Sequence, residues 1–252
     1  MSLASLKMDD NVVIKEEIDY VSNGKSVLES DLYNGTVSMA YTGESSGGAL
    51  TLTLHIDTVD NGEYKETFFL TTRADKGRNT IIKDKNGESR YVDGYATVNS
   101  LCLLTLNKEL KAMVEEPKVI KLWNWTTRSE EPTTVPVLVE LIGQPVTSGI
   151  HKINETKDRN TAPQGSPPKW ENTGETRDVN KIDKLFRAAD GLTVAEIKAG
   201  ATQESYKSTW LSNNKGVTQM RAKPVPGGQT QAATALSGAS AVDKPVKSIF
   251  GN

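Results

Sequence analysis

Two tryptophans and a lysine alternate in the segment 119–125, which reads Val-Ile-Lys-Leu-Trp-Asn-Trp. In a β-strand, Lys121, Trp123 and Trp125 would share one face, and the aliphatic residues between them would face the core. An exposed indole ring can stack on a nucleobase, with a gain of about 1–3 kcal/mol per base. Alternatively, the C-terminal part of the chain covers these rings and buries them as ordinary core. The spacing therefore predicts either a base-stacking face or a second interior face.

Basic side chains are concentrated in residues 73–90, although the whole chain of 252 residues carries a net charge of only -2. That segment has six cations and three acids, a net charge of +3, whereas residues 1–31 carry a net charge of -4. Asn86-Gly87 separates two short strand-like runs, 80–83 and 89–92, and so predicts a hairpin turn. The hairpin either neutralises phosphates, in a contact that salt weakens, or is an edge kept charged against strand pairing. The residues that would carry the phosphate contact are Arg73, Lys76, Arg78, Lys83, Lys85 and Arg90, with Tyr91 directly after them.

Ordinary enzyme chemistry has little support in the sequence. One cysteine, Cys102, and two histidines, His55 and His151, cannot supply a standard zinc site. The run 84–87 resembles the start of a calcium loop, but its glycine is misplaced and no glutamate closes it. Neither a phosphate-binding glycine loop nor a nucleophile elbow occurs. We therefore expect no enzyme, no metal and no cofactor, and an unrecognised enzymatic site would need converging carboxylates.

The elements that must position these residues are mostly strands. Residues 33–153 alternate between apolar and polar side chains, and Asn61-Gly62 predicts a hairpin from a strand over 50–56 into one over 64–73. On these two strands His55 and Phe69 point outward and are weaker candidates for ligand contact. We expect Met39 and Tyr41 to lie in the core.

One helix interrupts the strands. Apolar residues take helical spacing from 98 to about 114, and Glu115-Glu116-Pro117 ends the helix. Strand patterns resume at 118–125, 135–142 and 146–153. This order, several strands followed by one helix and then further strands, predicts a mainly β protein with a barrel similar to that of the oligonucleotide-binding (OB) fold. A meander sandwich is the alternative.

The last hundred residues are predicted to be less compact. A short helix is expected over 180–186, followed by a second one with capping-box spacing between Thr193 and Glu196. A third, around 203–211, would carry Tyr206 and Trp210 on one face. The predicted organisation is an acidic N-terminal segment 1–30, an OB-like barrel 31–154, a proline-rich linker 155–179, a small helical module 180–216 and a flexible tail 217–252.

The order of elements resembles that of the single-stranded DNA-binding proteins of double-stranded DNA bacteriophages with N4-like or related replication modules. The likeness spans about residues 30–216, and no single motif in it is diagnostic. One departure is the tail: residues 217–252 carry a net charge of +3, where many such proteins end in an acidic run that recruits partners. The resembling residues are Lys76-Gly77, the run 85–91, Asp93-Gly94-Tyr95, the helix ending near Leu110, the run 143–149, the run 177–180, Phe186, the run 190–196 and Trp210.

The resemblance implies an OB fold and the coating of single strands without strong sequence preference, in replication or recombination. We expect single-stranded DNA as the ligand, and replication proteins or a second copy of the chain as partners of the helical module or tail. No membrane partner is expected, because the N-terminus lacks a signal-peptide core and no run is long enough to span a bilayer. With a single cysteine, the chain suits the reducing cytoplasm. A structural or assembly protein of a phage virion is the alternative function.

Overall fold

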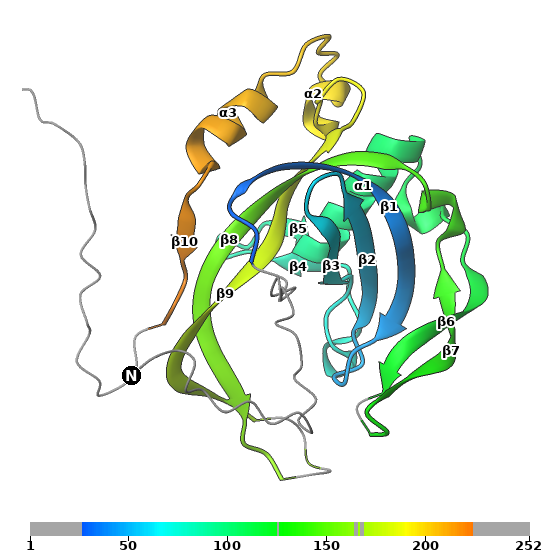
Figure 1. Cartoon of the computed structure of the whole chain (residues 1–252), viewed down its shortest axis with the longest axis vertical. Helices are drawn as coiled ribbons and strands as arrows, with labels where there is room; N and C mark the ends of the chain where they lie inside the picture. Colours follow the sequence, from blue (N-terminus) through cyan, green and yellow to red (C-terminus); the bar gives the residue numbers. More distant parts are fainter. Residues whose placement is uncertain (1–26, 125, 164–165, 167–168, 224–252) are drawn as a thin grey trace, which may run out of the picture. The chain divides into compact units, whose positions relative to one another are not determined.

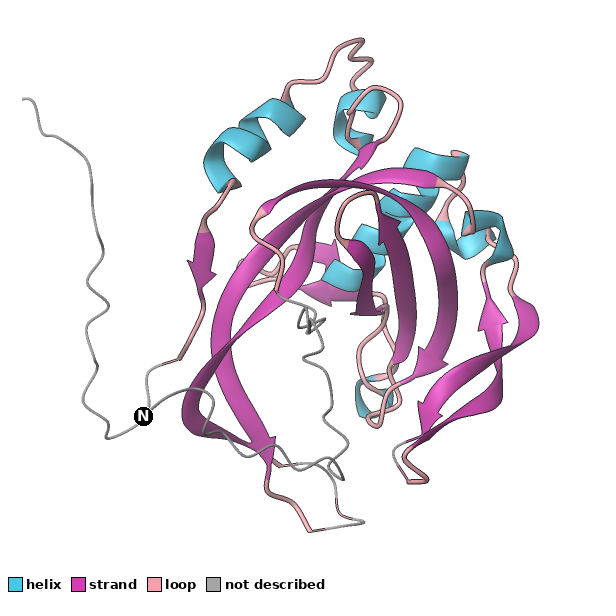
Figure 2. Ribbon diagram, in the orientation of Figure 1, coloured by secondary structure: helices cyan, strands magenta, loops and turns pink. Residues whose placement is uncertain are grey.

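The computed structural model describes residues 27–124, 126–163, 166 and 169–223. Most of the acidic N-terminal segment, Trp125 and the tail from residue 224 onward lie outside the described residues. The protein is mainly β, as the alternating pattern predicted (Figure 1, Figure 2). The strands are β1 (Asp31–Glu44), β2 (Leu50–Thr58), β3 (Gly62–Phe69), β4 (Ile81–Lys83), β5 (Ser89–Tyr91), β6 (Glu116–Asn124), β7 (Ser129–Val137), β8 (Pro145–Asn160), β9 (Trp170–Arg187) and β10 (Thr218–Met220).

Strands β1, β2 and β3 form an antiparallel meander (Figure 1). The predicted turn after β2 is present, where the Thr58 hydroxyl donates to the carbonyl oxygen of Gly62 at 2.6 Å. Leu52, Leu54 and Ile56 are buried on one face of β2, as their spacing predicted. β3 ends at Phe69, so Arg73 lies beyond the strand and not on its outer face as predicted.

The central helix is α1 (Asp93–Leu106). Its buried residues Val98, Leu101 and Cys102 pack in one cluster with the apolar face of the meander. Asn107 takes a left-handed conformation and ends the helix, and a short 3-10 helix, η3 (Leu110–Ala112), follows it. The predicted end near residue 114 is therefore too late.

The strands do not close into a barrel, so the barrel part of the predicted OB fold is wrong. The main sheet has the order β10-β8-β1-β2-β3, with β9 paired to β8 and β7 paired to β1 and β6. Among the described residues β3 is an edge that pairs only with β2, whereas closure would require a second partner. The short strands β4 and β5 form a separate two-stranded sheet.

Strands β6 and β7 form a long antiparallel hairpin. One of its faces packs on the outer side of β1: Tyr41, Val135 and Val137 are buried together, with Ile120 and Leu122 partly buried against them. The outer side of β1 is therefore a second, smaller core. The predicted strand over 135–142 is shorter than expected, because residues 139–141 form the 3-10 helix η4 (Val139–Leu141).

The predicted helix 180–186 is strand, and so are residues 155–160 and 170–179 of the predicted linker. β8 extends to Asn160 and β9 runs from Trp170 to Arg187, with Ile182 and Phe186 buried in the core. β9 is followed by α2 (Val194–Lys198), with the predicted Thr193–Glu196 capping box, and by α3 (Tyr206–Asn214). β10 occupies residues predicted to belong to the tail.

The chain divides into two compact units. Among the described residues, the larger unit holds 27–153, without residue 125, together with 178–219, and the smaller one holds the described part of 154–177 together with 220–223. β8 and β9 contribute residues to both units. No helix in the described part of the chain is both long and apolar enough to cross a bilayer.

Candidate functional site

The basic segment 73–90 forms a loop and a hairpin fixed to the ends of β1, β2 and β3. The backbone N–H of Ala74 donates to the carbonyl oxygen of Gly47, in the turn between β1 and β2. The Thr71 hydroxyl accepts a 3.0 Å hydrogen bond from the N–H of Leu50, and the N–H of Thr72 donates to the carbonyl oxygen of Asn79. The basic segment is therefore anchored to the meander by backbone hydrogen bonds, which hold its side chains at one end of the sheet.

The six cations of this segment fall into two groups. Each of the three arginines is paired with a nearby carboxylate: Arg73 with Asp75 at 3.3 Å, Arg78 with Glu44 at 3.1 Å, and Arg90 with Asp93. The lysines differ, because none of the three forms an ion pair with a carboxylate of the described residues. The charge left for an external anion therefore lies on Lys76, Lys83 and Lys85.

The predicted basic hairpin is present. β4 and β5 pair with Ile82 opposite Arg90, and the carboxylate of Asp84 closes the turn by accepting from the N–H groups of Asn86 and Glu88 at 2.8 and 2.9 Å. Asp84 therefore stabilises the turn, and calcium binding is not needed to explain an aspartate at this position. The hairpin therefore carries Lys83 and Lys85 on a short, closed turn.

Two tyrosine rings stack at the base of the hairpin. Tyr91, at the end of β5, is 50 % exposed, and its ring lies 4.9 Å from that of Tyr95 with an interplanar angle of 27°. Tyr95 belongs to the first turn of α1, and burial raises the pKa of its hydroxyl. Tyr91 was among the predicted site residues, whereas Tyr95 was not. The four-residue spacing of Tyr91 and Tyr95 did not predict their contact, because β5 ends at Tyr91 and α1 begins at Asp93, so the two residues do not belong to one regular element.

The backbone of Phe69, the last residue of β3, closely approaches the first turn of α1. A Cβ atom on Gly94 would lie 2.3 Å from the carbonyl oxygen of Phe69, so the start of α1 can pack on the end of β3 only with glycine at that position. Phe69 is itself 54 % exposed. The Tyr91–Tyr95 stack and the Arg90–Asp93 pair thus lie at the first turn of α1, whereas the Phe69 ring alternates with buried Phe68 and lies on the outer face of β3.

A cavity of about 310 Å³ adjoins the stacked tyrosines. Its lining is mainly apolar, from β2, the segment after β3, α1 and η3, together with threonine hydroxyls, the Glu115 carboxylate and the Lys111 ammonium group. Apolar walls with a few polar groups are typical of sites for small organic ligands. The lining includes Leu50, Leu70, Thr71, Thr80, Tyr95, Leu110, Met113 and Glu115.

Lys121 and Trp123 lie on β6, in a different hairpin from the basic segment. The predicted alternation is present: Ile120 and Leu122 face the second core, while Lys121 is exposed and Trp123 is 50 % exposed. The prediction of an outward indole is therefore confirmed for Trp123. Trp125 lies outside the described residues, so the predicted pairing of two indoles on this face stays a prediction.

The other reactive groups of the described chain have structural roles. His55 is hydrogen-bonded through Nδ1 to Glu63 at 2.8 Å and points to the same side of the sheet as Tyr41. The thiol of Cys102 is fully buried, and burial raises its pKa to about 12, so it remains protonated in the core. No group of three or more His, Cys, Asp or Glu side chains converges among the described residues.

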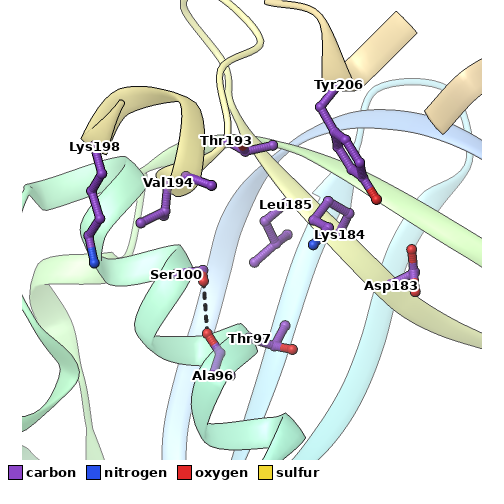
Figure 3. A pocket seen from close by; sticks show the side chains of 11 residues that line it. Ala96, Thr97, Ser100, Asp183, Lys184, Leu185, Thr193, Val194, Lys198 and Tyr206 are labelled. Carbon is purple, nitrogen blue, oxygen red and sulfur yellow. Dashed lines mark hydrogen bonds between the residues drawn. The ribbon is translucent and has the colours of Figure 1, made fainter. Parts of the chain in front are cut away.

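A second cavity, of about 460 Å³, lies between α1, β9, α2 and α3 (Figure 3). Lys184 and Lys198 border it, and the ammonium group of Lys184 lies 5.3 Å from the centre of the Tyr206 ring. The sequence analysis proposed Tyr206 and Trp210 together as a partner-binding face. Trp210 is only 2 % exposed and belongs to the core, so that face is reduced to Tyr206, which is 42 % exposed.

Comparison with known proteins adds no identification. Neither a scan against protein-family models nor a search of curated proteins returned a match to this sequence. The function is therefore argued from the geometry and charge of the chain itself.

Proposed function

We propose that the protein binds single-stranded DNA without strong sequence preference. Bases stack on the exposed rings of Tyr91, beside the first turn of α1, and of Phe69, on the outer face of β3, and the lysines of the basic hairpin neutralise the phosphates. The resemblance of the sequence to phage single-stranded DNA-binding proteins suggests DNA replication or recombination as the setting. Trp123 and Lys121 offer a further stacking face on the β6–β7 hairpin.

The observation that carries the proposal is the joint position of rings and unpaired lysines. Phe69 and Tyr91 are both at least half exposed. Stacking of a nucleobase on an exposed aromatic ring contributes about 1–3 kcal/mol to the binding free energy. Lys83 and Lys85 are on the hairpin whose last residue is Tyr91, and neither forms an ion pair with a carboxylate of the described residues. A charged edge that only prevented strand pairing would not require half-exposed aromatic rings beside it.

Binding without sequence preference is also consistent with this surface. The exposed part of the hairpin offers cations and ring faces, and every nucleobase has a face that stacks. A binder of this kind tolerates sequence and depends strongly on salt.

The test is a titration of a fluorescein-labelled dT oligonucleotide by anisotropy, at low and high salt, with the full chain. We expect Tyr91→Ala and Phe69→Ala each to weaken binding at low salt by about 5-fold or more, the lower end of the stacking range. Tyr206→Ala is the matched control, because it removes a similarly exposed ring from α3. Trp123→Ala measures the contribution of the β6 face separately.

Two results would count against the proposal. Binding that survives at high salt and in both ring variants would remove the site from the basic hairpin. Absence of binding at low salt, together with stable self-assembly of the chain, would favour a structural or assembly role in a virion. Circular dichroism of each variant confirms that the fold is retained.

A further inference from the structure

The cavity beside the stacked tyrosines has the size of a site for one small ring system. Its volume of about 310 Å³ lies at the lower end of the range for ligand sites, about 300–1,000 Å³. Tyr95 both lines the cavity and stacks on Tyr91, the last residue of the basic hairpin. Thr80, which directly precedes β4, also lines the cavity. A group held there would therefore lie at the base of the hairpin that carries Lys83 and Lys85.

The carboxylate of Glu115 is available to a ligand in this cavity. The buried Thr42 hydroxyl donates to one of its oxygens at 2.7 Å and so fixes its position. The other oxygen accepts from no described residue, and Glu115 forms no ion pair within the described part of the chain. Of the described residues that line the cavity, only Lys111 also carries a charge, and its ammonium group is paired with Glu109 at 2.7 Å. The free carboxylate oxygen attracts N–H donors and repels phosphate.

The threonine hydroxyls of the lining differ in how far their hydrogen bonds are already used. The Thr71 hydroxyl accepts from the N–H of Leu50 and donates to the carbonyl oxygen of Thr72, both at 3.0 Å. The Thr80 hydroxyl forms no hydrogen bond with another described residue, although the Thr80 carbonyl oxygen accepts from the N–H of Val92 at 2.9 Å. A free hydroxyl can donate to a ligand or accept from it. The cavity thus offers a carboxylate oxygen and a hydroxyl on otherwise mainly apolar walls.

We propose that this cavity takes one base of the bound strand and selects a base with an exocyclic amino group, cytosine above thymine. The amino group of cytosine donates to Glu115, a pairing that carboxylates make with this base, and the Thr80 hydroxyl donates to the adjacent ring nitrogen. Thymine has a carbonyl oxygen in place of the amino group and would face the carboxylate with an acceptor. Extruding a base from a single strand breaks no base pair, which keeps the cost of insertion low.

The inference rests on the proposed function for the identity of the ligand. Selection acts on one nucleotide only, so the stacking of the other bases on Tyr91 and Phe69 remains tolerant of sequence.

The test compares two dT oligonucleotides in the anisotropy titration with the full chain. One has 5-methylcytosine at its central position and the other has thymine throughout, so the two differ only in the hydrogen-bonding edge of one pyrimidine. We expect the strand with 5-methylcytosine to bind about 5-fold more tightly, the lower end of the discrimination that side chains achieve at a base edge. The readout is the ratio of the two dissociation constants, because a change in net charge alters both constants together.

Glu115→Gln should abolish this preference. The amide keeps an acceptor for Thr42, but it can also donate to the carbonyl oxygen of thymine, so the two pyrimidines become alike to the cavity. Asp60→Asn is the matched control and should retain the preference, because it removes the same charge from the exposed turn between β2 and β3. A preference that Glu115→Gln retains would overturn the role of this carboxylate.

A second measurement examines the cavity without the polymer. In the full chain labelled with carbon-13 at the methionine methyl groups, Met113 reports on the cavity that it lines, and Met113→Leu assigns its resonance. We expect 5-methyldeoxycytidine to shift this resonance more than thymidine does at the same concentration.

The outcomes separate this inference from the proposed function. Equal affinity for the two strands, in a chain that binds dT, would overturn the selection by the cavity and leave the proposed function intact. A nucleoside-specific shift of the Met113 methyl, in a chain that binds neither strand, would keep the cavity as a base site and remove the proposed function. Absence of both binding and shift would overturn both.

Discussion

Nε1 of Trp210 donates a 2.7 Å hydrogen bond to a carboxylate oxygen of Asp183, which joins α3 to β9. The same indole stacks on the ring of His151 in β8, with centroids 5.2 Å apart and an interplanar angle of 13°. His151 is in turn within 2.8 Å of the side-chain nitrogen of Gln219 in β10. One tryptophan thus connects a helix with three strands, which explains why it is core although it lies on a short, polar helix.

The Trp210 cluster depends on a glycine in β8. A Cβ atom on Gly149 would come within 2.9–3.1 Å of three atoms of the indole ring. Gly149→Ala should therefore displace the ring and lower the free energy of unfolding by about 1–3 kcal/mol, as measured by urea denaturation. Gly43→Ala is the matched control in a strand, since its Cβ would meet only the Thr51 hydroxyl at 3.5 Å. Equal stability of the two variants would show that the indole can move without cost.

Much of the fold around the candidate site could be predicted from the sequence. Alternation identified β2 and β6 and the face of each, and the Asn-Gly pairs identified the two hairpin turns. Capping-box spacing correctly identified the start of α2 at Thr193. These features are local, because each depends on a few neighbouring residues and on backbone geometry.

The parts of the structure that the sequence did not predict depend on contacts between residues far apart in the chain. The outer part of the β8–β9 hairpin is polar on both faces, so it has no apolar alternation, and cross-strand pairs such as Lys157–Glu175 accompany its backbone pairing. Ile182, Leu185 and Phe186 have helical spacing, yet pairing with β8 makes the segment strand. The Tyr91–Tyr95 stack likewise could not be predicted, because it depends on how the first turn of α1 packs against the end of β3.

Glu196 joins α2 to α3 by accepting five hydrogen bonds. One oxygen accepts from Thr193, and the other accepts from the N–H groups of Ser205 and Tyr206 and from the Ser205 hydroxyl. These donors lower the pKa of Glu196 to about 2. The stabilisation is therefore present above the unfolded pKa near 4.5 and is lost as the pH falls toward 2.

Glu196→Gln tests this connection, because an amide can accept on only one side. We expect a loss of about 1–2 kcal/mol in the free energy of unfolding at pH 7, after allowance for solvent screening, and a smaller difference from wild type at pH 3. Urea denaturation at both pH values is the measurement. Glu88→Gln, an exposed glutamate in the hairpin turn, should change stability little at either pH. A loss that is the same at pH 7 and pH 3 would refute a role for the carboxylate charge.

Glu66 shows the opposite shift. Burial raises the pKa of its carboxyl, although the same oxygen accepts from the Tyr64 hydroxyl at 2.7 Å and from the N–H of Ile182 at 2.8 Å. A raised pKa means that this group's contribution to stability is complete below the unfolded value of 4.5 and is lost as the pH rises through the folded value. The ionised carboxylate is therefore a cost at neutral pH.

Glu66→Gln keeps an oxygen acceptor for both donors and removes the charge. At pH 7 the variant should be at least as stable as wild type, and the difference should shrink as the pH falls through the raised folded pKa toward 4.5. Glu66→Ala, which leaves the Tyr64 hydroxyl without its acceptor, should cost about 1–3 kcal/mol. Thermal unfolding across pH 4–8 measures both variants. A glutamine variant that is less stable than wild type at pH 7 would contradict the assignment of the charge as a cost.

Salt dependence tests the lysines of the basic hairpin directly. Each phosphate contact to a single strand contributes about 0.7 to the slope of log K against log salt concentration. Replacing both Lys83 and Lys85 with glutamine should therefore reduce the magnitude of that slope by about 1.4 for a dT oligonucleotide. Lys184→Gln with Lys198→Gln is the matched control, because it removes the same charge from the cavity beside Tyr206. A slope that falls equally in both double variants would mean that net charge alone governs binding, whereas a fall confined to the hairpin variant locates the phosphates on β4 and β5.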